Sequence, residues 1–142
     1  MKNFKTLACL TGLTAIMCFS ACSTGSITAA KNPVDELVDL CVDGNYNEAS
    51  KHMIYHGSDK SRGPRDAANY ASDDADSKKQ VEMICNQMKA MKKVKYTVGP
   101  ERSEQGLSVF DVNIEENGKS GKRLWAFLKI NGKYALADID SE

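Results

Sequence analysis

The sequence predicts an α+β protein in which helices come first and an antiparallel sheet follows. Two periodicities lead to this prediction. From Pro33 to about Lys93, apolar residues recur every three or four positions, as on one face of a helix. From Val94 onward they alternate with polar residues, as in a half-buried strand. Asn131-Gly132, between two alternating runs, indicates a tight hairpin, and helices followed by strands is the order of an α+β domain.

The first 21 residues have the three parts of a secretory signal peptide. Lys2 and Lys5 give a positive start, an uncharged apolar run covers residues 6–19, and Ser20-Ala21 lead to Cys22. The apolar run is shorter than the ~20 residues that a membrane-spanning helix needs. Phe19-Ser20-Ala21-Cys22 resembles the lipobox of bacterial lipoproteins, in which the cysteine thiol takes a diacylglyceryl group.

We therefore predict that residues 1–21 are removed and that Cys22 becomes a lipidated N-terminus in the cell envelope. Two or three acyl chains on one residue hold a protein stably on a membrane. Residues 22–31 are small and polar, and are predicted to be a flexible tether. In lipoprotein sorting an Asp after the cysteine favours the inner membrane, so Ser23 predicts the outer membrane. The alternative is an ordinary signal peptide that happens to contain cysteines.

Length and charge predict one domain, residues 32–142, with no electrostatic affinity for nucleic acid. Removing 21 of 142 residues leaves 121, enough for one hydrophobic core. The chain has 19 basic and 19 acidic residues, and the leader takes two lysines, so the mature net charge is −2. The cluster Lys89, Lys92, Lys93 and Lys95 is interpreted as the solvated end of a helix, where cations are favoured.

Three helices are predicted, each with one apolar stripe. The first covers residues 32–44 and has Asn32 as its N-cap. The second covers 45–53, and the third runs from about 72 to 93. The segment 57–69 is rich in turn formers and charges and is predicted to be a long surface loop.

Four strands are predicted to form a curved antiparallel meander, at about residues 94–98, 110–115, 124–130 and 134–138. In the third strand Leu124, Ala126, Leu128 and Ile130 line one face. Trp125 and Phe127 line the other face, which is expected to point away from the helices. A large aromatic pair is rarely left bare, so sheet curvature, a second subunit or a ligand should cover it.

Cys41 and Cys85 remain after the leader and the lipid site are counted. Both lie on inward stripes of helices that should pack together. An oxidising compartment permits a disulfide, but spacing alone does not distinguish one bridge from two buried thiols.

No constellation in the sequence predicts catalysis or metal binding. His52 and His56 are four residues apart but lack a third ligand beyond Asp59. Asp73, Asp74 and Asp76 suit the start of a helix better than a metal site. No nucleophile elbow or phosphate-binding glycine loop is present, and no cofactor is predicted.

Two phrases and the order of elements carry a resemblance. Residues 43–49 read Asp-Gly-Asn-Tyr-Asn-Glu-Ala, and Gly132-Lys133-Tyr134 lies near the end. They resemble the Gly-Asp-Tyr-x-x-Ala and Gly-x-Trp phrases of small bacterial lipoproteins of the nuclear transport factor 2-like superfamily (the DUF4878 or lumazine-binding-like group). Tyr134 in place of Trp is a departure. The resemblance covers about residues 32–140 and rests more on layout than on identity.

That resemblance implies a cystatin-like or nuclear transport factor 2-like cone, a curved sheet wrapped by three helices around a pocket. Such a fold hosts isomerases, dehydratases and many binding proteins, so it does not determine function. None of the catalytic motifs of these enzymes can be matched to this chain.

The predicted function is a lipid-anchored envelope protein whose domain binds a small apolar ligand or a protein without catalysis. One alternative is an isomerase- or dehydratase-type enzyme that uses Tyr46, Tyr96, Asp111 or Asp138 in the cone. Another is a scaffold that forms a homodimer through Trp125 and Phe127. The residues predicted to line the pocket or the interface are Tyr46, Met88, Tyr96, Phe110, Trp125 and Phe127.

Overall fold

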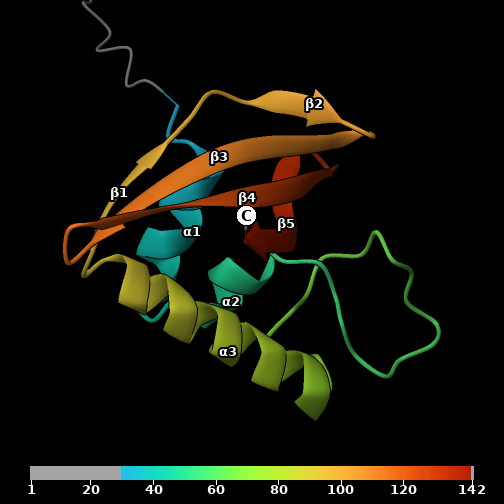
Figure 1. Cartoon of the computed structure of the whole chain (residues 1–142). Helices are drawn as coiled ribbons and strands as arrows, with labels where there is room; N and C mark the ends of the chain where they lie inside the picture. The colour runs from blue at the N-terminus through green and yellow to red at the C-terminus, as the bar shows by residue number, and fades with distance from the viewer. Residues whose placement is uncertain (1–29, 142) are drawn as a thin grey trace, which may run out of the picture.

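The computed structural model describes residues 30–141. The predicted leader and Cys22 lie outside the described residues, as does most of the predicted tether. Helices cover one face of a single antiparallel sheet (Figure 1). The helices are α1 (Pro33–Val42), α2 (Tyr46–Ser50) and α3 (Ala75–Met91). The strands are β1 (Lys95–Val98), β2 (Arg102–Glu104), β3 (Leu107–Glu116), β4 (Lys119–Ile130) and β5 (Lys133–Ser141).

The α+β prediction is confirmed, but the predicted count of four strands is wrong. The sheet has the order β1-β3-β4-β5, and β2 also pairs with β3. The additional strand, β2, forms a hairpin with β3 through Gln105-Gly106, both of which have positive φ. All three residues of β2 are exposed, so it has no alternation that periodicity could detect.

Local capping explains where the helices begin. The side chain of Asn32 accepts a hydrogen bond from the Asp35 amide at 2.9 Å, and Asp74 accepts one from the Ser77 amide at 2.9 Å. Because Asp74 is the cap, α3 starts at Ala75, three residues later than predicted.

The second helix is shorter than predicted because the chain leaves it to join the sheet. α2 ends at Ser50, and Met53 pairs in parallel with Leu136 of β5. The Ile54 amide donates to the Leu136 carbonyl at 3.0 Å, and the Leu136 amide donates to His52 at 2.8 Å. These bonds satisfy backbone groups that a longer helix would have satisfied internally.

The core lies between the helices and the facing side of the sheet. It contains Val34, Leu37 and Val38 from α1, Val81, Met88 and Met91 from α3, and inward residues of β3, β4 and β5. Among residues 30–141, no helix is long and apolar enough to span a bilayer.

Candidate functional site

The aromatic residues that were predicted to line a pocket or an interface fill the core instead. Phe110, Trp125 and Phe127 are at most 4% exposed, and Met88 is 1% exposed. Trp125 pairs with Phe110 across β3 and β4 and stacks on Phe127, with ring centroids 6.4 Å apart. These side chains therefore point toward the helices.

The predicted orientation of β4 is thus wrong. Both faces of this strand are apolar, so alternation alone identifies two sets of side chains without showing which set is inside. Burying the indole and phenyl rings removes more apolar surface from water than burying Leu124 and Leu128 would. Trp125 and Phe127 cannot form a dimer interface, because neither is exposed.

Tyr134 closes one end of this aromatic cluster. Its ring lies edge-on to Phe110 and to Phe127, with centroids 6.1 Å apart in both pairs. Its hydroxyl donates to Glu101 at 2.8 Å, and Ser108 donates to the same carboxylate at 2.6 Å. The bond from Ser108 and then that from Tyr134 lower the pKa of Glu101. Side chains, rather than a hollow, thus occupy the region where the cone pocket was expected.

Tyr46 and Tyr96 are partly buried at the edges of the core, and both hydroxyls have partners. Lys89 donates to the Tyr46 hydroxyl at 2.6 Å, and the Tyr96 hydroxyl donates to Asp35 at 2.8 Å. Burial, together with the bond to Asp35, raises the pKa of Tyr96 far above its usual value. Tyr96 therefore stays protonated at neutral pH and is unsuited to act as a general base.

The structure joins Cys41 and Cys85 in a disulfide. Cys41 lies near the end of α1, and Cys85 lies on the inward face of α3. Both residues are fully buried, so the bridge links the two helices inside the core.

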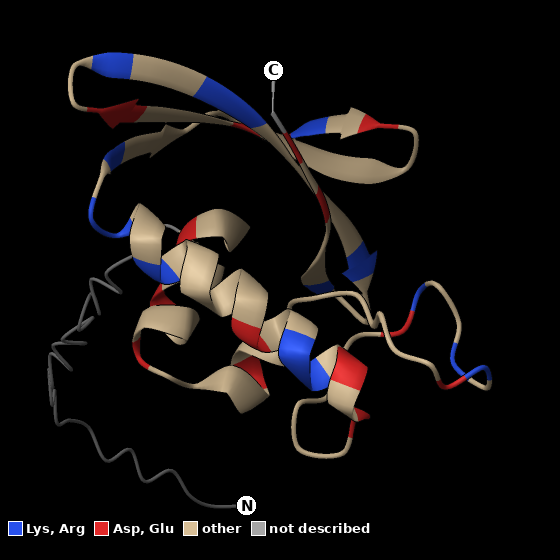
Figure 2. Cartoon of the chain, turned by 60° about the horizontal axis from the view of Figure 1, so that its bottom comes forward, with Lys and Arg blue, Asp and Glu red and all other residues tan. Residues whose placement is uncertain are grey.

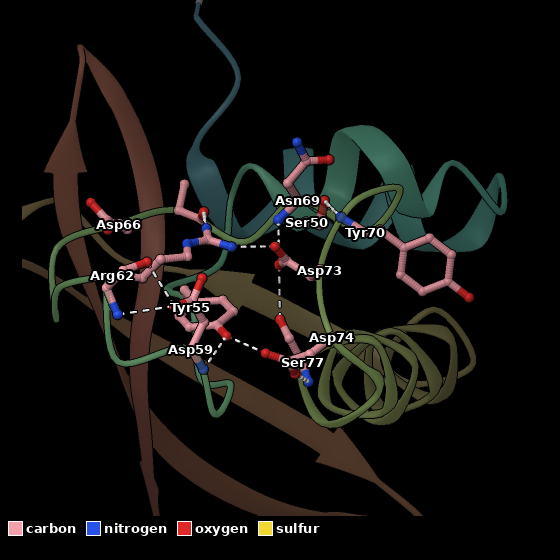
Figure 3. A network of polar contacts seen from close by, with 12 residues as sticks. Ser50, Tyr55, Asp59, Arg62, Asp66, Asn69, Tyr70, Asp73, Asp74 and Ser77 are labelled. Carbon is pink, nitrogen blue, oxygen red and sulfur yellow. Dashed lines mark hydrogen bonds and ion pairs between the residues drawn. The ribbon is translucent and has the colours of Figure 1, made fainter.

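A polar cluster holds the long loop between α2 and α3 (Figure 3). Its centre is Arg62, which forms an ion pair with Asp73, donates to the Ala67 carbonyl at 2.5 Å and lies 3.8 Å over the Tyr55 ring. Asp73 also accepts bonds from the Asn69 amide at 2.6 Å and the Ser77 hydroxyl at 2.9 Å. Its side chain is 1% exposed.

The second half of this loop cluster is the pair Tyr55 and Asp74. The Tyr55 hydroxyl donates to Asp74, which also accepts from the amides of Ser77 and Ser58. The bond from Tyr55 and then that from Ser77 lower the pKa of Asp74. Burial, followed by the bond to Asp74, raises the pKa of Tyr55.

A surface hollow of about 450 Å³ lies beside the loop cluster, lined by Tyr55, Asp59, Arg62, Ser72, Asp73 and Asp74. The pKa values of Tyr55 and Asp74 move apart and away from neutrality, which is the opposite of what general acid–base catalysis needs. The side chains of Arg62, Asp73 and Asp74 are engaged with one another or with the backbone. The cluster therefore anchors the loop to the start of α3.

The two histidines do not come together as a metal site. His52 is 4% exposed, with its Nδ1 atom 3.2 Å from the Tyr134 carbonyl, whereas His56 is exposed. Across residues 30–141, no group of three or more His, Cys, Asp and Glu is arranged to hold a metal ion.

A second hollow lies between α3 and β5, lined by His56, Gln80, Ile84, Leu136, Ala137, Asp138 and Ile139. Its floor is apolar, but its volume is only about 170 Å³. Small-molecule sites usually enclose ~300–1,000 Å³. This groove can take a single side chain rather than a whole ligand.

The face of the sheet turned away from the helices carries an apolar stripe. We call Leu124, Ala126, Leu128 and Ile130 the outer stripe. All four are partly exposed, and none is packed against the core. Aspartates lie directly beside the stripe, because Asp111 and Asp140 pair with Leu124 and Asp138 pairs with Ala126. Asp111 forms ion pairs with Arg102 and Lys122, so the negative charge beside the stripe comes from Asp138 and Asp140. This face is the best candidate for a binding surface.

Comparisons with known proteins add a likeness of shape. No protein-family model matches the chain, and a search of curated proteins finds no similar sequence. The chain is similar to an NTF2-like protein of unknown function from Cytophaga hutchinsonii, with TM-score 0.40 and 19% identity over 78% of this chain and 87% of that one. It is also similar to a designed NTF2 chain, with TM-score 0.45 and 15% identity over 77% and 92% of the two chains. Because the sequence identities and TM-scores are this low, these structural similarities carry no information about function.

Sequence reasoning missed the outer stripe and the loop cluster for different reasons. The alternation of β4 groups the four stripe residues on one face of the strand, but the predicted orientation puts that face against the helices. Arg62 and Asp73 are eleven residues apart in a segment without periodicity, so no local pattern joins them. The adjacent acids Asp73 and Asp74 correctly indicated a helix start, which is the one signal that pointed to the cluster.

Proposed function

We propose that this protein is a lipid-anchored envelope protein whose α+β domain binds a protein partner without catalysing a reaction. The observation that carries the proposal is the outer stripe, which leaves four aliphatic side chains partly exposed on the sheet face turned away from the helices. Contiguous apolar surface of this kind is typical of protein–protein contacts.

The filled interior argues against a small apolar ligand inside the cone. Phe110, Trp125 and Phe127 occupy the space between sheet and helices, and Tyr134 covers them at one end. A ligand there would have to displace rings that are packed against each other, and removing such rings from a core is costly. A protein partner on the opposite face requires no such rearrangement.

The charges beside the outer stripe indicate what kind of partner fits. Asp138 and Asp140 have no ion-pair partner among residues 30–141, and both flank Leu124 and Ala126. A surface that presents apolar residues next to lysine or arginine would complement them. Such charges contribute mainly to specificity and to the rate of association.

Site-specific photocrosslinking in intact cells tests the binding surface. A benzoylphenylalanine placed at Leu128, in the outer stripe, should yield one discrete crosslinked product. The same probe at Lys79, on the exposed side of α3, is the matched control and should yield none. A product of twice the chain mass would identify the partner as a second copy. Equal labelling at both positions, or none at Leu128, would contradict the proposal.

A separate measurement tests the anchor. The wild-type chain should incorporate radioactive palmitate and sediment with membranes, because the Cys22 thiol is the proposed acceptor of the lipid. Cys22→Ala should lose both properties. If the Cys22→Ala chain still incorporates palmitate, Cys22 is not the lipidation site. That result would not affect the crosslinking test of the binding surface.

A further inference from the structure

One end of the domain is rich in basic residues, and it is the end at which the described chain begins. Lys31 opens the domain, Lys92 is the C-cap of α3, and Lys93 follows it. Lys95 lies in β1, while Lys119, Lys122 and Arg123 lie in the β3–β4 hairpin. We call these seven residues the basic end. Figure 2 shows the blue segments just after the end of α3, in β1 and in this hairpin on the same side of the molecule, whereas the blue segment at the start of α3 lies at the other end of that helix.

We infer that the basic end lies against the anionic surface of the membrane and orients the domain there. The inference rests on the proposed lipid anchor, which would bring this end to the bilayer. Anionic phospholipid headgroups are the partner, because they present a dense plane of negative charge to a cluster of cations.

Ion pairs, strand pairing and one hydrogen bond hold the segments of the basic end together. Asp39 of α1 forms ion pairs with both Lys31 and Lys92, so the start of the domain lies beside the end of α3. Strand pairing brings Lys95 opposite Glu115, and Glu115 opposite the start of β4. The Tyr96 hydroxyl bonds Asp35, which ties β1 to α1.

The charge of this end differs in sign from that of the rest of the domain. Its seven basic residues are accompanied by five acids, namely Asp35, Asp39, Asp111, Glu115 and Glu116. The remaining described chain has ten basic and thirteen acidic residues. Lys93, Lys119 and Arg123 are exposed and have no ion-pair partner within residues 30–141. These three are available to bind phosphate groups of the bilayer.

The distance from the anchor makes this contact geometrically accessible. Seven residues, 23–29, lie between the proposed lipidated Cys22 and Ala30, so the two are eight residue steps apart. Fully extended, eight steps reach at most about 29 Å. The domain is thus confined to a layer whose depth is only a few times the ~10 Å over which charges act at 0.1 M salt.

The shape of the hairpin supports a contact with headgroups. A hollow of about 400 Å³ lies at the end of β3 and β4, lined by Ile114, Glu116, Asn117, Lys119, Ser120, Gly121, Lys122 and Arg123. Its lining brings three cationic side chains together with the apolar side chain of Ile114.

Vesicle sedimentation with the unlipidated mature chain (residues 22–142, Cys22→Ser) tests the inference apart from the anchor. At 20 mM salt this chain should bind vesicles of phosphatidylglycerol and phosphatidylcholine but not vesicles of phosphatidylcholine alone. Binding should weaken at 300 mM salt, since screening shortens the range of the charges. Each basic residue at an anionic surface is worth about a fivefold factor in partitioning. The variant Lys93→Glu, Lys119→Glu, Arg123→Glu should therefore bind at least about tenfold more weakly.

A matched variant controls for net charge. Lys60→Glu, Lys78→Glu and Lys79→Glu make the same change of charge in the loop and at the start of α3, away from the basic end. This variant should retain most of the binding of the wild type. Equal loss in the two triple variants, or no binding by the wild type to phosphatidylglycerol vesicles, would overturn the inference. The emission of the single tryptophan, Trp125, reports whether each variant is folded.

Lysine labelling of the native protein in proteoliposomes gives a second readout. Lys93 and Lys119 should react more slowly with an amine reagent in phosphatidylglycerol vesicles than in phosphatidylcholine vesicles, while Lys79 should react equally in both. If each of the three lysines reacts at the same rate in both kinds of vesicle, the domain is not oriented by the anionic lipid. A chain that lacks the lipid anchor would fail to enter these vesicles but would still give a result in the sedimentation assay.

Discussion

Phe127 and Leu128 are neighbours in β4, yet they meet opposite environments. Phe127 is fully buried against Phe110, Trp125 and Tyr134, whereas Leu128 is partly exposed in the outer stripe. Comparing substitutions at these two positions therefore shows which face of the sheet packs against the core.

Phe127→Ala should lower the free energy of unfolding by about 3–5 kcal/mol, because it leaves a cavity among the core rings. Leu128→Ala should cost less than about 1 kcal/mol, as expected for a surface position. Urea titrations followed by Trp125 emission measure both. A larger loss for Leu128→Ala would mean that the sheet faces the other way.

Asp74 couples stability to pH. Its pKa is lowered in the folded protein, so it stabilises the fold above the usual aspartate pKa of about 4. This contribution is lost as the pH falls through the lower, folded value. Asp74→Asn should therefore be less stable than the wild type at pH 7, and the two should converge in acid.

Urea unfolding at several pH values between 7 and 2 measures this convergence. Asp76→Asn is the control, since Asp76 lies in the same first turn of α3 but is exposed. It removes a charge near the helix N-terminus without removing the bonds to Tyr55 and Ser58. A difference between Asp74→Asn and the wild type that stays constant down to pH 2 would exclude the proposed coupling.

At the level of the elements, Arg62 makes polar contacts that tie the loop between α2 and α3 together, in addition to the apolar packing of Ala68 and Tyr70. Arg62 reaches Asp73, Ala67 and the Tyr55 ring, which lie at the two ends of the loop (Figure 3). An ordered connection of this length needs such contacts to offset the entropy of fixing it.

Arg62→Ala should free the loop and speed cleavage after Lys60 by the lysine-specific protease Lys-C. The neighbouring Arg65 is exposed and has no ion-pair partner in the part of the chain that the structure describes, so Arg65→Ala should leave the rate unchanged. Cleavage rates at 25 °C, read by mass spectrometry, compare the two. Equal rates in both variants would show that Arg62 does not hold the loop.

At the scale of the whole molecule, the Cys41–Cys85 bridge links the first and last helices across 44 residues. Closing a loop of this length reduces the entropy of the unfolded chain, with an expected effect of about 4 kcal/mol. Cys41→Ala with Cys85→Ala should lower the free energy of unfolding by an amount of that order. Urea unfolding with and without a reductant measures this loss. If the reductant does not lower the urea concentration at which the wild type unfolds, the bridge is excluded.

Much of the fold could be predicted because it depends on local chemistry. Asn32 caps α1, and Asn131-Gly132 turns between β4 and β5 with φ of 49° and 79°, as a type I′ turn requires. The change from helical to strand periodicity near Val94 also needs only neighbouring residues. The candidate binding surface could not be predicted to the same extent, since its four residues were identified but placed on the wrong side of the sheet.

The α+β order, the helix caps and the hairpin between β4 and β5 follow from the amino-acid sequence, because each depends on residues within a few positions of one another. Three features became known from the three-dimensional structure alone: Trp125 is inside and Leu124 outside, residues 52–54 join β5, and Arg62 pairs with Asp73. Those outcomes depend on which distant segments pack together, and on how much apolar surface each packing removes from water.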